Sequence, residues 1–179
     1  MKSLVFDTET TDLISNSLLP LDQQPRVIEF YGRLIEDDGK IISELDFLCN
    51  PGHPLSPTTT RITGIKTADV KREPPFSHFA KQVKELINGA EAVVAHNLSY
   101  DFDILNFEFR RCGIFDDVVW PENRICTVES TEWYNGYRLN LTALHEHLFG
   151  EPFKDAHRAK SDVEALARCF VEMRKRGDV

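Results

Sequence analysis

Two carboxylates stand two positions apart near the start of the chain, where the apolar run 4–6 leads into Asp7, Thr8 and Glu9. In a β-strand, side chains two positions apart lie on the same face of the sheet, so Asp7 and Glu9 are expected to point together. Grouped carboxylates repel one another and lose hydration when buried, so such a group needs a compensating cation. The pair therefore indicates a divalent metal site, although a solvated strand end is the more frequent meaning of two acids at this spacing.

Two more acids and one histidine strengthen the case for a metal site. Asp101 follows directly on the short buried strand expected at 92–97, and Asp162 lies near the start of the last helix, five positions after His157. Strand ends and helix starts meet at one edge of an α/β sheet, so these side chains are expected to come together. Hard oxygen ligands favour Mg²⁺ or Mn²⁺ over zinc. Four carboxylates with a nearby histidine are what the hydrolysis of a phosphodiester by two metal ions requires.

The alternation of apolar and polar residues predicts the elements that must position these side chains. Strands are expected over 2–6, 26–36, 40–49, 90–97 and 123–128, and helices over 75–89, 100–113, 140–150 and 161–176. The turn Asp-Asp-Gly at 37–39 is a strong hairpin signal, and Ser99 is a candidate N-cap for the helix that follows it. A hairpin followed by alternating strands and helices predicts a mixed α/β sheet in a single domain over 1–179.

Composition and charge exclude several classes of protein. The 179 residues include 41% hydrophobic residues, but no uninterrupted apolar run approaches the ~20 residues that a membrane helix needs. Because acidic residues appear too early for a signal peptide, we expect a cytoplasmic protein that contacts no membrane. The net charge of −8 excludes a protein that coats long nucleic acid, so any such contact is expected to be short, local and assisted by metal. The four cysteines form no CxxC pair, which argues against a structural zinc site and favours a reduced compartment.

Three short motifs follow one another along the chain: Asp-Thr-Glu-Thr at 7–10, His-Asn-Leu-Ser-Tyr-Asp at 96–101 and His-Arg-Ala-Lys-Ser-Asp at 157–162. They resemble, in order, the three exonuclease motifs of the DEDDh 3′→5′ exonucleases, and the chain is most similar to the DnaQ-like proofreading (epsilon) subunit of bacterial DNA polymerase III. A sister group carries a tyrosine four residues before its last aspartate, where this chain has Arg158. The resemblance implies a ribonuclease H-like fold, a mixed five-stranded sheet flanked by helices, and release of nucleoside 5′-monophosphates from a 3′ end.

The resemblance also implies roles for the acids and the histidine. The expected metal ligands, which are catalytic together with His157, are Asp7, Glu9, Asp101 and Asp162. Asp7 would bridge two divalent ions about 3.5–4 Å apart. Glu9 and Asp162 would complete the site that holds the attacking water, and Asp101 would support the second ion. His157 occupies the general-base position, since an unperturbed pKa near 6.5 lets a histidine accept a proton around neutral pH.

Six residues are expected to contact the substrate by the same resemblance: Thr8, Thr10, Ile62, Ile65, His96 and Asn97. Ile62 and Ile65 belong to a segment that resembles the apolar surface on which the terminal nucleotide packs, and ordinary core packing is the alternative. His96 and Asn97 would either orient the substrate or serve the end of the strand structurally.

Other residues near the motifs receive weaker interpretations. The family usually has glycine where this chain has Asp12, so either the turn differs or Asp12 adopts a left-handed conformation. Asp103 is interpreted as a solvated helix residue. The aromatic residues of the expected loop 129–139 could stack on unpaired bases, although packing against the core is favoured. The expected loop 13–25 is interpreted as a rim of the active site.

Together these patterns predict a Mg²⁺-dependent 3′→5′ exonuclease, with Mn²⁺ as a substitute, that acts on single-stranded or frayed DNA ends. An RNA 3′-end trimming exoribonuclease of the same family is the alternative, and DNA is favoured over RNA by resemblance alone. A non-catalytic module that binds nucleic-acid ends is less favoured because the acids and the histidine are present, and the ordered motifs weaken an internally cutting ribonuclease. A polymerase partner is possible, although the chain ends soon after the last motif helix, which favours a freestanding nuclease or an unusually minimal proofreading subunit.

Overall fold

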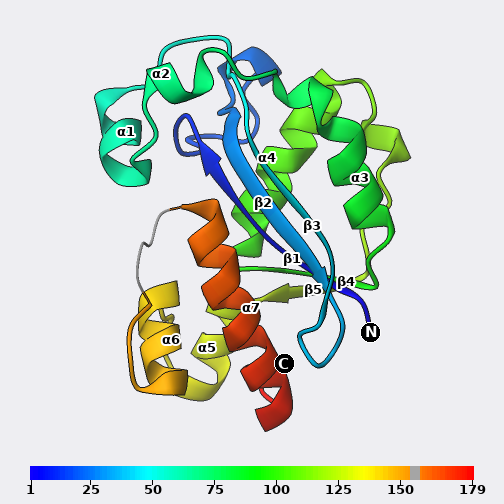
Figure 1. The fold of residues 1–179 in the computed structure, drawn as a ribbon, viewed down its shortest axis with the longest axis vertical. Coiled ribbons are helices and arrows are strands. Elements are labelled where there is room, and N and C mark those ends of the chain that lie inside the picture. The colour runs from blue at the N-terminus through cyan, green and yellow to red at the C-terminus, as the bar shows by residue number, and fades with distance from the viewer. Residues whose placement is uncertain (154–157) are drawn as a thin grey trace.

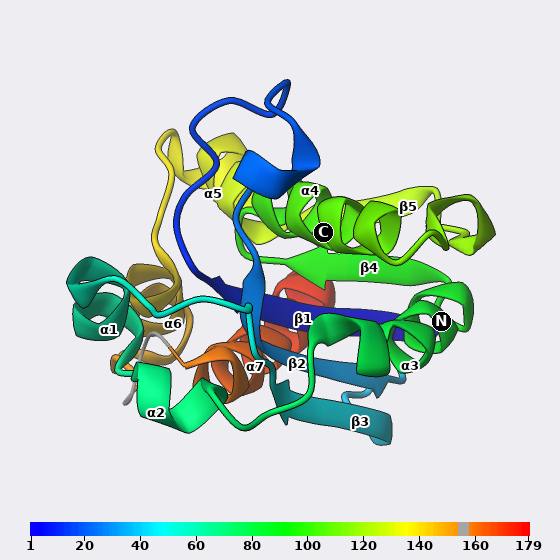
Figure 2. The same ribbon diagram turned by 90° about the horizontal axis from the view of Figure 1, so that it is seen from above.

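The computed structural model describes residues 1–153 and 158–179, apart from the side chains of 133–135. The described strands form a sheet in the order β3-β2-β1-β4-β5 (Figures 1 and 2). Their bounds are β1 Ser3–Thr10, β2 Val27–Ile35, β3 Ile41–Leu48, β4 Ala92–Ala95 and β5 Asn123–Cys126. β2 is antiparallel to β1 and β3, whereas β4 is parallel to β1 and β5. The predicted mixed five-stranded sheet is therefore confirmed.

The helices lie on both faces of this sheet. Their bounds are α1 Pro57–Thr63, α2 Thr67–Val70, α3 Ala80–Asn88, α4 Leu98–Arg111, α5 Thr127–Asn135, α6 Leu141–Phe149 and α7 Ala159–Arg176, with short 3-10 turns at Leu21–Gln23, Phe76–His78 and Phe115–Asp117. One face of the sheet packs against α3 and α4, and the other packs against α6 and α7. In the part of the chain that the structure describes, no helix is long and apolar enough to span a bilayer.

The alternation of side chains along β1 decides which of them reach which face. Leu4 and Phe6 are fully buried in the cluster formed with α3 and α4, whereas Val5 is fully buried in the cluster formed with α6 and α7. Because successive side chains point to opposite faces, Asp7 and Glu9 continue the face of Val5. The strand therefore sends its acids toward α7.

Three helices lie where the sequence pattern predicted none. α5 occupies most of the expected loop 129–139, because its apolar residues do not repeat at a helical period and so gave no signal. α1 and α2 are too short for a period to be visible, and they begin after local caps. The first strand is also longer than expected, since it continues through its acidic residues to Thr10.

The backbone around the second motif differs from the prediction as well. Ser99 is not the N-cap of α4, because the helix begins after Asn97, whose φ of 80° and ψ of 50° lie in the left-handed region. Asn97 is the one residue other than glycine with a positive φ in the described part of the chain, so Asp12 does not adopt that conformation. Instead, the carbonyl of Asp12 accepts hydrogen bonds from the hydroxyls of Thr10 at 2.8 Å and Tyr100 at 3.0 Å. The turn at Asp12 is thus held by side chains, which removes the need for glycine there.

Candidate active site

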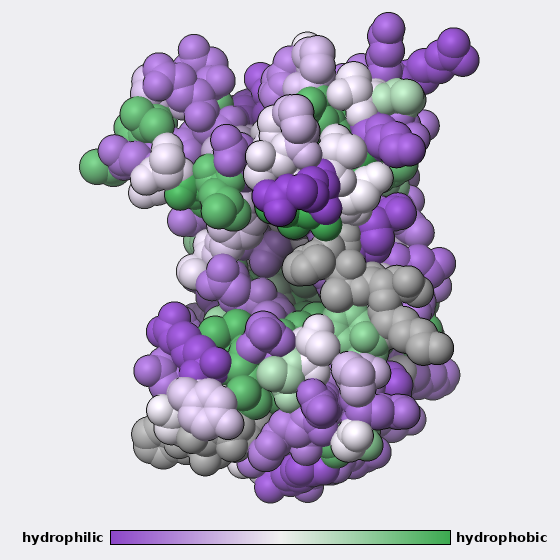
Figure 3. Space-filling view, turned by 90° about the vertical axis from the view of Figure 1, so that its left-hand side faces the viewer, coloured by the Kyte–Doolittle hydropathy of each residue, from purple (hydrophilic) through white to green (hydrophobic). Residues whose placement is uncertain are grey.

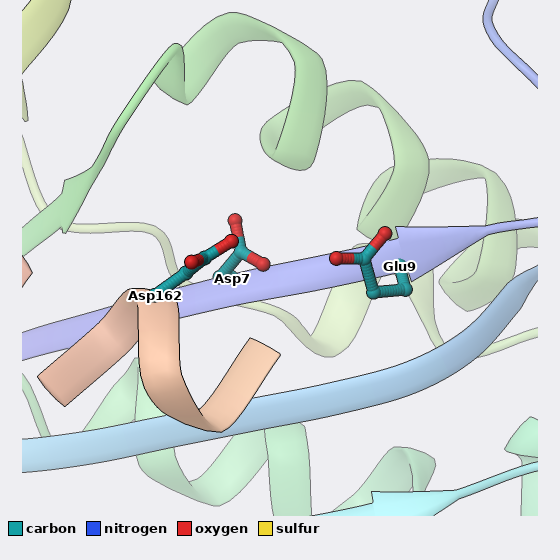
Figure 4. A group of neighbouring side chains, drawn as sticks. All are labelled: Asp7, Glu9 and Asp162. Atoms are coloured by element: carbon teal, nitrogen blue, oxygen red, sulfur yellow. The ribbon is translucent and has the colours of Figure 1, made fainter. Parts of the chain in front are cut away.

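Three carboxylates meet at the carboxyl end of β1. Asp7 and Glu9 project from the strand and Asp162 projects from the first turn of α7, with their side chains turned toward one another (Figure 4). One carboxylate oxygen from each of the three lies within 4.8 Å of the others. This grouping brings together residues from both ends of the chain, as the motif spacing predicted for these three acids.

Asp101 approaches the same place from the other face of the sheet. Its Oδ1 accepts two hydrogen bonds from Thr8, one from the hydroxyl at 2.6 Å and one from the backbone N–H at 3.1 Å. Asp101 is buried, and it is not one of the three acids in the tight group. Thr8 is buried too, and its hydroxyl is engaged by Asp101.

Burial raises the pKa of Asp7, Glu9 and Asp101 above the usual values of carboxyl groups. Burial, followed by the charges of Asp101 and Glu9, raises the pKa of Asp7 well above its usual value. Burial and then the charges of Asp162 and Glu29 raise the pKa of Glu9 to about 8. Burial also raises the pKa of Asp101 to about 7, although the hydrogen bonds from Thr8 oppose this shift. Oxygen donors that repel one another in this way fit a hard divalent cation, which would remove the repulsion.

A cavity of about 600 Å³ opens over the carboxylates. Its walls come from β1, from the start of α4 and from the first turns of α6, and they include all four predicted metal ligands: Asp7, Glu9, Asp101 and Asp162. Figure 3 shows this side of the molecule, where a hollow separates an upper part from a lower part. A cavity of this volume accepts a ligand of the size of a nucleotide.

Comparison with known proteins identifies the family of this fold and site. The family model described as RNase T, Exonuclease, matches residues 4–170. The chain belongs to this exonuclease family. The family membership predicted from the three motifs is thereby confirmed.

The exonuclease family relatives with similar sequences include large polymerases. The DNA polymerase III PolC-type of Listeria monocytogenes is 32% identical over 168 residues, which cover 91% of this chain and 10% of the polymerase. The corresponding protein of Streptococcus sanguinis is 30% identical over 170 residues, which cover 93% of this chain and 11% of that protein. The chain thus spans about a tenth of the length of these curated relatives.

Solved structures of exonucleases share the fold. The structure of exonuclease I has a TM-score of 0.78 at 18% identity and covers 97% of this chain and 41% of its own. Exonuclease X, solved in complex with 5′ overhanging duplex DNA, has a TM-score of 0.67 at 24% identity over 98% of this chain and 93% of its own. The nuclease domain of 3′hExo, a DEDDh family member bound to rAMP, has a TM-score of 0.76 at 20% identity over 98% of this chain and 92% of its own. These likenesses confirm the expected ribonuclease H-like fold.

The residues predicted to contact the substrate fall in different environments. Asn97 and His96 line the cavity, whereas Thr10 contacts a lining residue, since its hydroxyl is 2.5 Å from that of Tyr100. Ile62 is 50% exposed, whereas Ile65 is 2% exposed and packs with Ile28 in a small core cluster. Of the two isoleucines, only Ile62 therefore offers surface to a ligand in this structure.

The imidazole ring of His96, which lines the cavity, is uncharged. Its Nδ1 lies 2.9 Å from the hydroxyl of Thr127, the first residue of α5. Burial lowers the pKa of His96 to about 4, so the ring carries no charge near neutral pH. The contact joins the end of β4 to the start of α5, as expected if His96 has a structural role at the end of the strand. A role in orienting the substrate stays a prediction.

Two predicted features lie outside what the structure describes. His157, the expected general base, falls in 154–157, and the side chains of Trp133 and Tyr134 are likewise not described. Of the other residues in that expected loop, Tyr137 is 62% exposed and Arg138 forms an ion pair with Glu132 at 2.8 Å. The stacking role proposed for these aromatic residues stays a prediction.

The structure also places residues at the site that no sequence pattern singled out. Tyr100 lines the cavity next to Asp101, and burial raises its pKa to about 12, so its hydroxyl stays protonated. Glu146 of α6 also lines the cavity. Tyr100 had a usable signal, since it directly precedes a motif acid. Glu146 had none, because its helix lies far along the chain from every motif acid except Asp162.

A buried acid on the neighbouring strand fixes the start of α7. Glu29 lies opposite Glu9 in the β1–β2 pairing and is 3% exposed. Its carboxylate accepts hydrogen bonds from Arg158, at 2.6 Å from Nη2 and at 3.1 and 3.2 Å from Nε to the two oxygens, and another from the backbone N–H of Ala159 at 3.0 Å. Ala159 is the first residue of α7, so Glu29 caps the helix that carries Asp162 three residues later. The clamp holds Asp162 against the two acids of β1.

Replacing Glu29 by glutamine is expected to raise the Mn²⁺ concentration needed for half-maximal activity about 10–100-fold, the range seen when the support of a metal ligand is lost. Glutamine keeps an acceptor for Ala159 but loses the charge that holds Arg158, so α7 and Asp162 become less firmly placed. A Mn²⁺ titration of the rate measures this effect. Glu44→Gln is the matched control, because Glu44 pairs with Arg33 elsewhere on the sheet. Equal metal requirements in the two variants would show that the Glu29 clamp does not position Asp162.

Without a divalent ion, the free energy of unfolding is expected to fall as the pH rises from about 4 to about 8. The unfolded carboxyl groups titrate at 3.8 for Asp and 4.5 for Glu, whereas folded Asp101 and Glu9 titrate at about 7 and about 8. Between these values the folded protein binds more protons than the unfolded chain, so stability is lost with rising pH. The loss begins above about pH 4 and is complete above about pH 8.

Urea unfolding across this pH window, in chelator and in Mn²⁺, measures that dependence. A bound cation keeps the carboxylates ionised in the folded state, so Mn²⁺ should flatten the slope. Glu9→Gln should reduce the slope in chelator, because it removes one of the raised carboxyl groups. A slope that is the same with and without Mn²⁺ would argue against a metal site at these acids.

Proposed function

We propose that residues 1–179 act as one exonuclease domain that removes nucleoside 5′-monophosphates from the 3′ end of single-stranded or frayed DNA. The observation that carries the proposal is the group of Asp7, Glu9 and Asp162, whose oxygens lie within 4.8 Å of one another at the bottom of a nucleotide-sized cavity. Membership of the exonuclease family supports the same reaction.

Some residues of the site would hold the metal ions, and others position the residues that do so. Asp7, Glu9, Asp101 and Asp162 would hold two divalent ions, Mg²⁺ or the substitute Mn²⁺. When bound, such ions neutralise the charge that develops on a phosphodiester under attack by water. Thr8 keeps Asp101 turned toward the site through its two hydrogen bonds. Glu29 and Arg158 keep the start of α7 against the sheet.

His157 is the proposed general base. It directly precedes Arg158, which the structure clamps to Glu29, and it precedes Asp162 by five positions. A histidine with an ordinary pKa accepts a proton from water around neutral pH. The carboxylates of the site would be ionised once metal is bound, and negative charge of this kind favours the imidazolium that results from proton transfer.

The choice of DNA over RNA, and of a polymerase as partner, rests on the relatives. The similar sequences belong to PolC-type DNA polymerases, and exonuclease X was solved with duplex DNA. A neighbouring structure contains rAMP, however, and another exonuclease of this fold recognises a histone mRNA stem-loop. RNA trimming is therefore the second candidate, and the experiment must compare the two sugars directly.

The test is a time course on single-stranded DNA and RNA oligomers of equal sequence, labelled at either the 5′ or the 3′ end. Each is run with Mg²⁺, with Mn²⁺ and with chelator. We expect mononucleotides to leave the 3′ end of DNA faster than that of RNA, and only with metal. Faster loss of RNA would move the protein to the RNA-trimming branch, and products from internal cuts would contradict the proposal. Inert protein in the presence of either metal would leave the non-catalytic end-binding module.

A further inference from the structure

Four basic residues lie in α1 or on either side of α2, in a protein whose net charge is −8. They are Arg61, Lys66, Lys71 and Arg72, and all four are exposed. We call residues 57–72, with these four cations, the basic lobe. The lobe is a local exception in an acidic molecule, because four cations fall within twelve consecutive positions, 61–72, that hold a single acid, Asp69.

The four cations have no ion-pair or aromatic partner among the described residues, which is otherwise true only of the scattered Lys2, Arg26 and Lys175 in that part of the chain. Most of the rest are engaged, including Arg33, Arg111 and Arg158 in ion pairs and Arg110, Arg124 and Arg168 over aromatic rings. None of the cations of the basic lobe makes an ion pair or lies over a ring in the described part of the chain. Cations left without partners on one surface keep their full attraction for an external polyanion.

The basic lobe is attached to the end of the sheet that carries the carboxylates. The hydroxyl of Thr59 in α1 donates to the carbonyl of Thr11 at 2.7 Å, two residues beyond Glu9. On the underside of the lobe, Ile65 and Val70 pack with Ile28, the neighbour of Glu29 on β2. Figures 1 and 2 both show α1 and α2 beyond the carboxyl end of β1, beside the start of α7.

Local caps hold the lobe in a defined shape. The hydroxyl of Ser56 accepts a hydrogen bond from the N–H of Thr59 at 3.0 Å and caps α1. Gly64 ends α1 with a φ of 74°, in the left-handed region that suits glycine. The carboxylate of Asp69 then accepts from the N–H of Lys66 at 2.7 Å and closes the start of α2. These contacts place the four cations on a folded surface and not on a loose loop.

We infer that the basic lobe holds the phosphate backbone of the strand that leads to the cleaved 3′ end, an inference that rests on the proposed function. The catalytic end of a polyanionic strand must enter a cavity lined by Asp7, Glu9, Asp101 and Asp162. Cations at the rim offset that repulsion without neutralising the metal site itself. Because backbone contacts carry no sequence information, the lobe fits single strands of any sequence.

The test measures the binding of a labelled single-stranded DNA of about 16 nucleotides by fluorescence anisotropy, in an Asp7→Asn background that is not expected to cut it. The lobe variant carries Arg61→Gln, Lys66→Gln, Lys71→Gln and Arg72→Gln. Its matched control carries Lys2→Gln, Lys40→Gln, Lys175→Gln and Arg176→Gln. These exposed residues lie before β1, in the turn between β2 and β3, and at the end of α7. Both variants lower the net charge by four units, from −7 in the Asp7→Asn background to −11.

We expect the lobe variant to bind at least about tenfold more weakly than the control variant at low salt. The slope of log Kd against log salt should become shallower by about 0.7 for each phosphate contact that is lost, which approaches 3 for four contacts. The difference should shrink for an oligomer of about 4 nucleotides, too short to reach beyond the cavity. Urea unfolding of both variants checks that the fold is intact.

Equal Kd values and equal slopes for the lobe and control variants would overturn the inference, and an acidic surface on a partner protein would then be the better occupant. A loss that is the same for the short and the long oligomer would also overturn it, because the lobe would then act on the cavity and not on the distal strand. Binding is read without hydrolysis. The inference therefore fails separately from the proposed function, which fails if the unmutated enzyme with Mn²⁺ releases no nucleotide.

Discussion

Replacing Asp7 by asparagine is expected to lower kcat by at least about 10²–10³-fold, the loss that follows removal of one preorganised charged group from an active site. Asp7 stands between the other acids: it shares the tight group with Glu9 and Asp162, and its pKa is also raised by the charge of Asp101. Asparagine has the same shape but cannot supply a negative oxygen to two divalent ions. The rate of release from a 3′-labelled oligomer measures the effect.

The same substitution is expected to raise the free energy of unfolding in chelator. Burial and the neighbouring acids disfavour the charged form of Asp7, so a neutral side chain removes repulsion from the folded state. Activity and stability should therefore move in opposite directions, which distinguishes a strained functional site from a structural one. Asp103→Asn is the control, because Asp103 lies two positions past Asp101, is partly exposed on α4, and is not one of the metal-site acids. An Asp7→Asn variant that is less stable in chelator, or that keeps its rate, would contradict this account.

The parts of the site that could be predicted from the sequence are those whose signal is local. Asp7 and Glu9 follow one apolar run and stand two positions apart, which is the period of a strand, and Asp101 follows a second apolar run. Patterns a few residues long therefore predict two strands that bring these acids to one edge of the sheet. The mixed α/β sheet agrees with the prediction for the same reason, since a hairpin turn and buried strands each show in a short window. Asp162 was placed by motif spacing and by its position at a helix start.

The parts that could not be predicted depend on contacts between distant residues. Glu29 and Arg158 are 129 positions apart, and nothing near either one indicates that a buried acid on β2 will cap α7. The left-handed conformation of Asn97 was also not predicted, since the sequence suggested Ser99 as the N-cap of α4. α1 was not expected because its seven residues give too few turns for a hydrophobic period, yet its Thr59 donates to the carbonyl of Thr11, two residues beyond Glu9. Tertiary packing decided each of these features.

Replacing His157 by alanine is expected to lower kcat by about 10²–10⁴-fold, the usual contribution of a positioned general base. In the sequence, His157 falls between Phe153, which lines the cavity, and Arg158, which donates to Glu29. Loss of a base that is not a metal ligand should leave Mn²⁺ affinity close to that of the unmutated protein. A Mn²⁺ titration monitored by thermal unfolding separates this variant from those of the carboxylates, in which affinity should fall.

The pH dependence of the rate gives the sharper form of this last test. If His157 takes a proton from the attacking water, the rate with saturating Mn²⁺ should rise with pH through about 6.5, where an unperturbed imidazole loses its charge. His157→Ala should remove that rise, and added imidazole should restore part of the rate. His78→Ala is the control, because His78 is an exposed histidine that packs edge-on against Phe79. A His157→Ala variant that keeps both the rate and the rise through pH 6.5 would transfer the role of base to another group, and Tyr100 could not take it, because its pKa of about 12 keeps its hydroxyl protonated across this range.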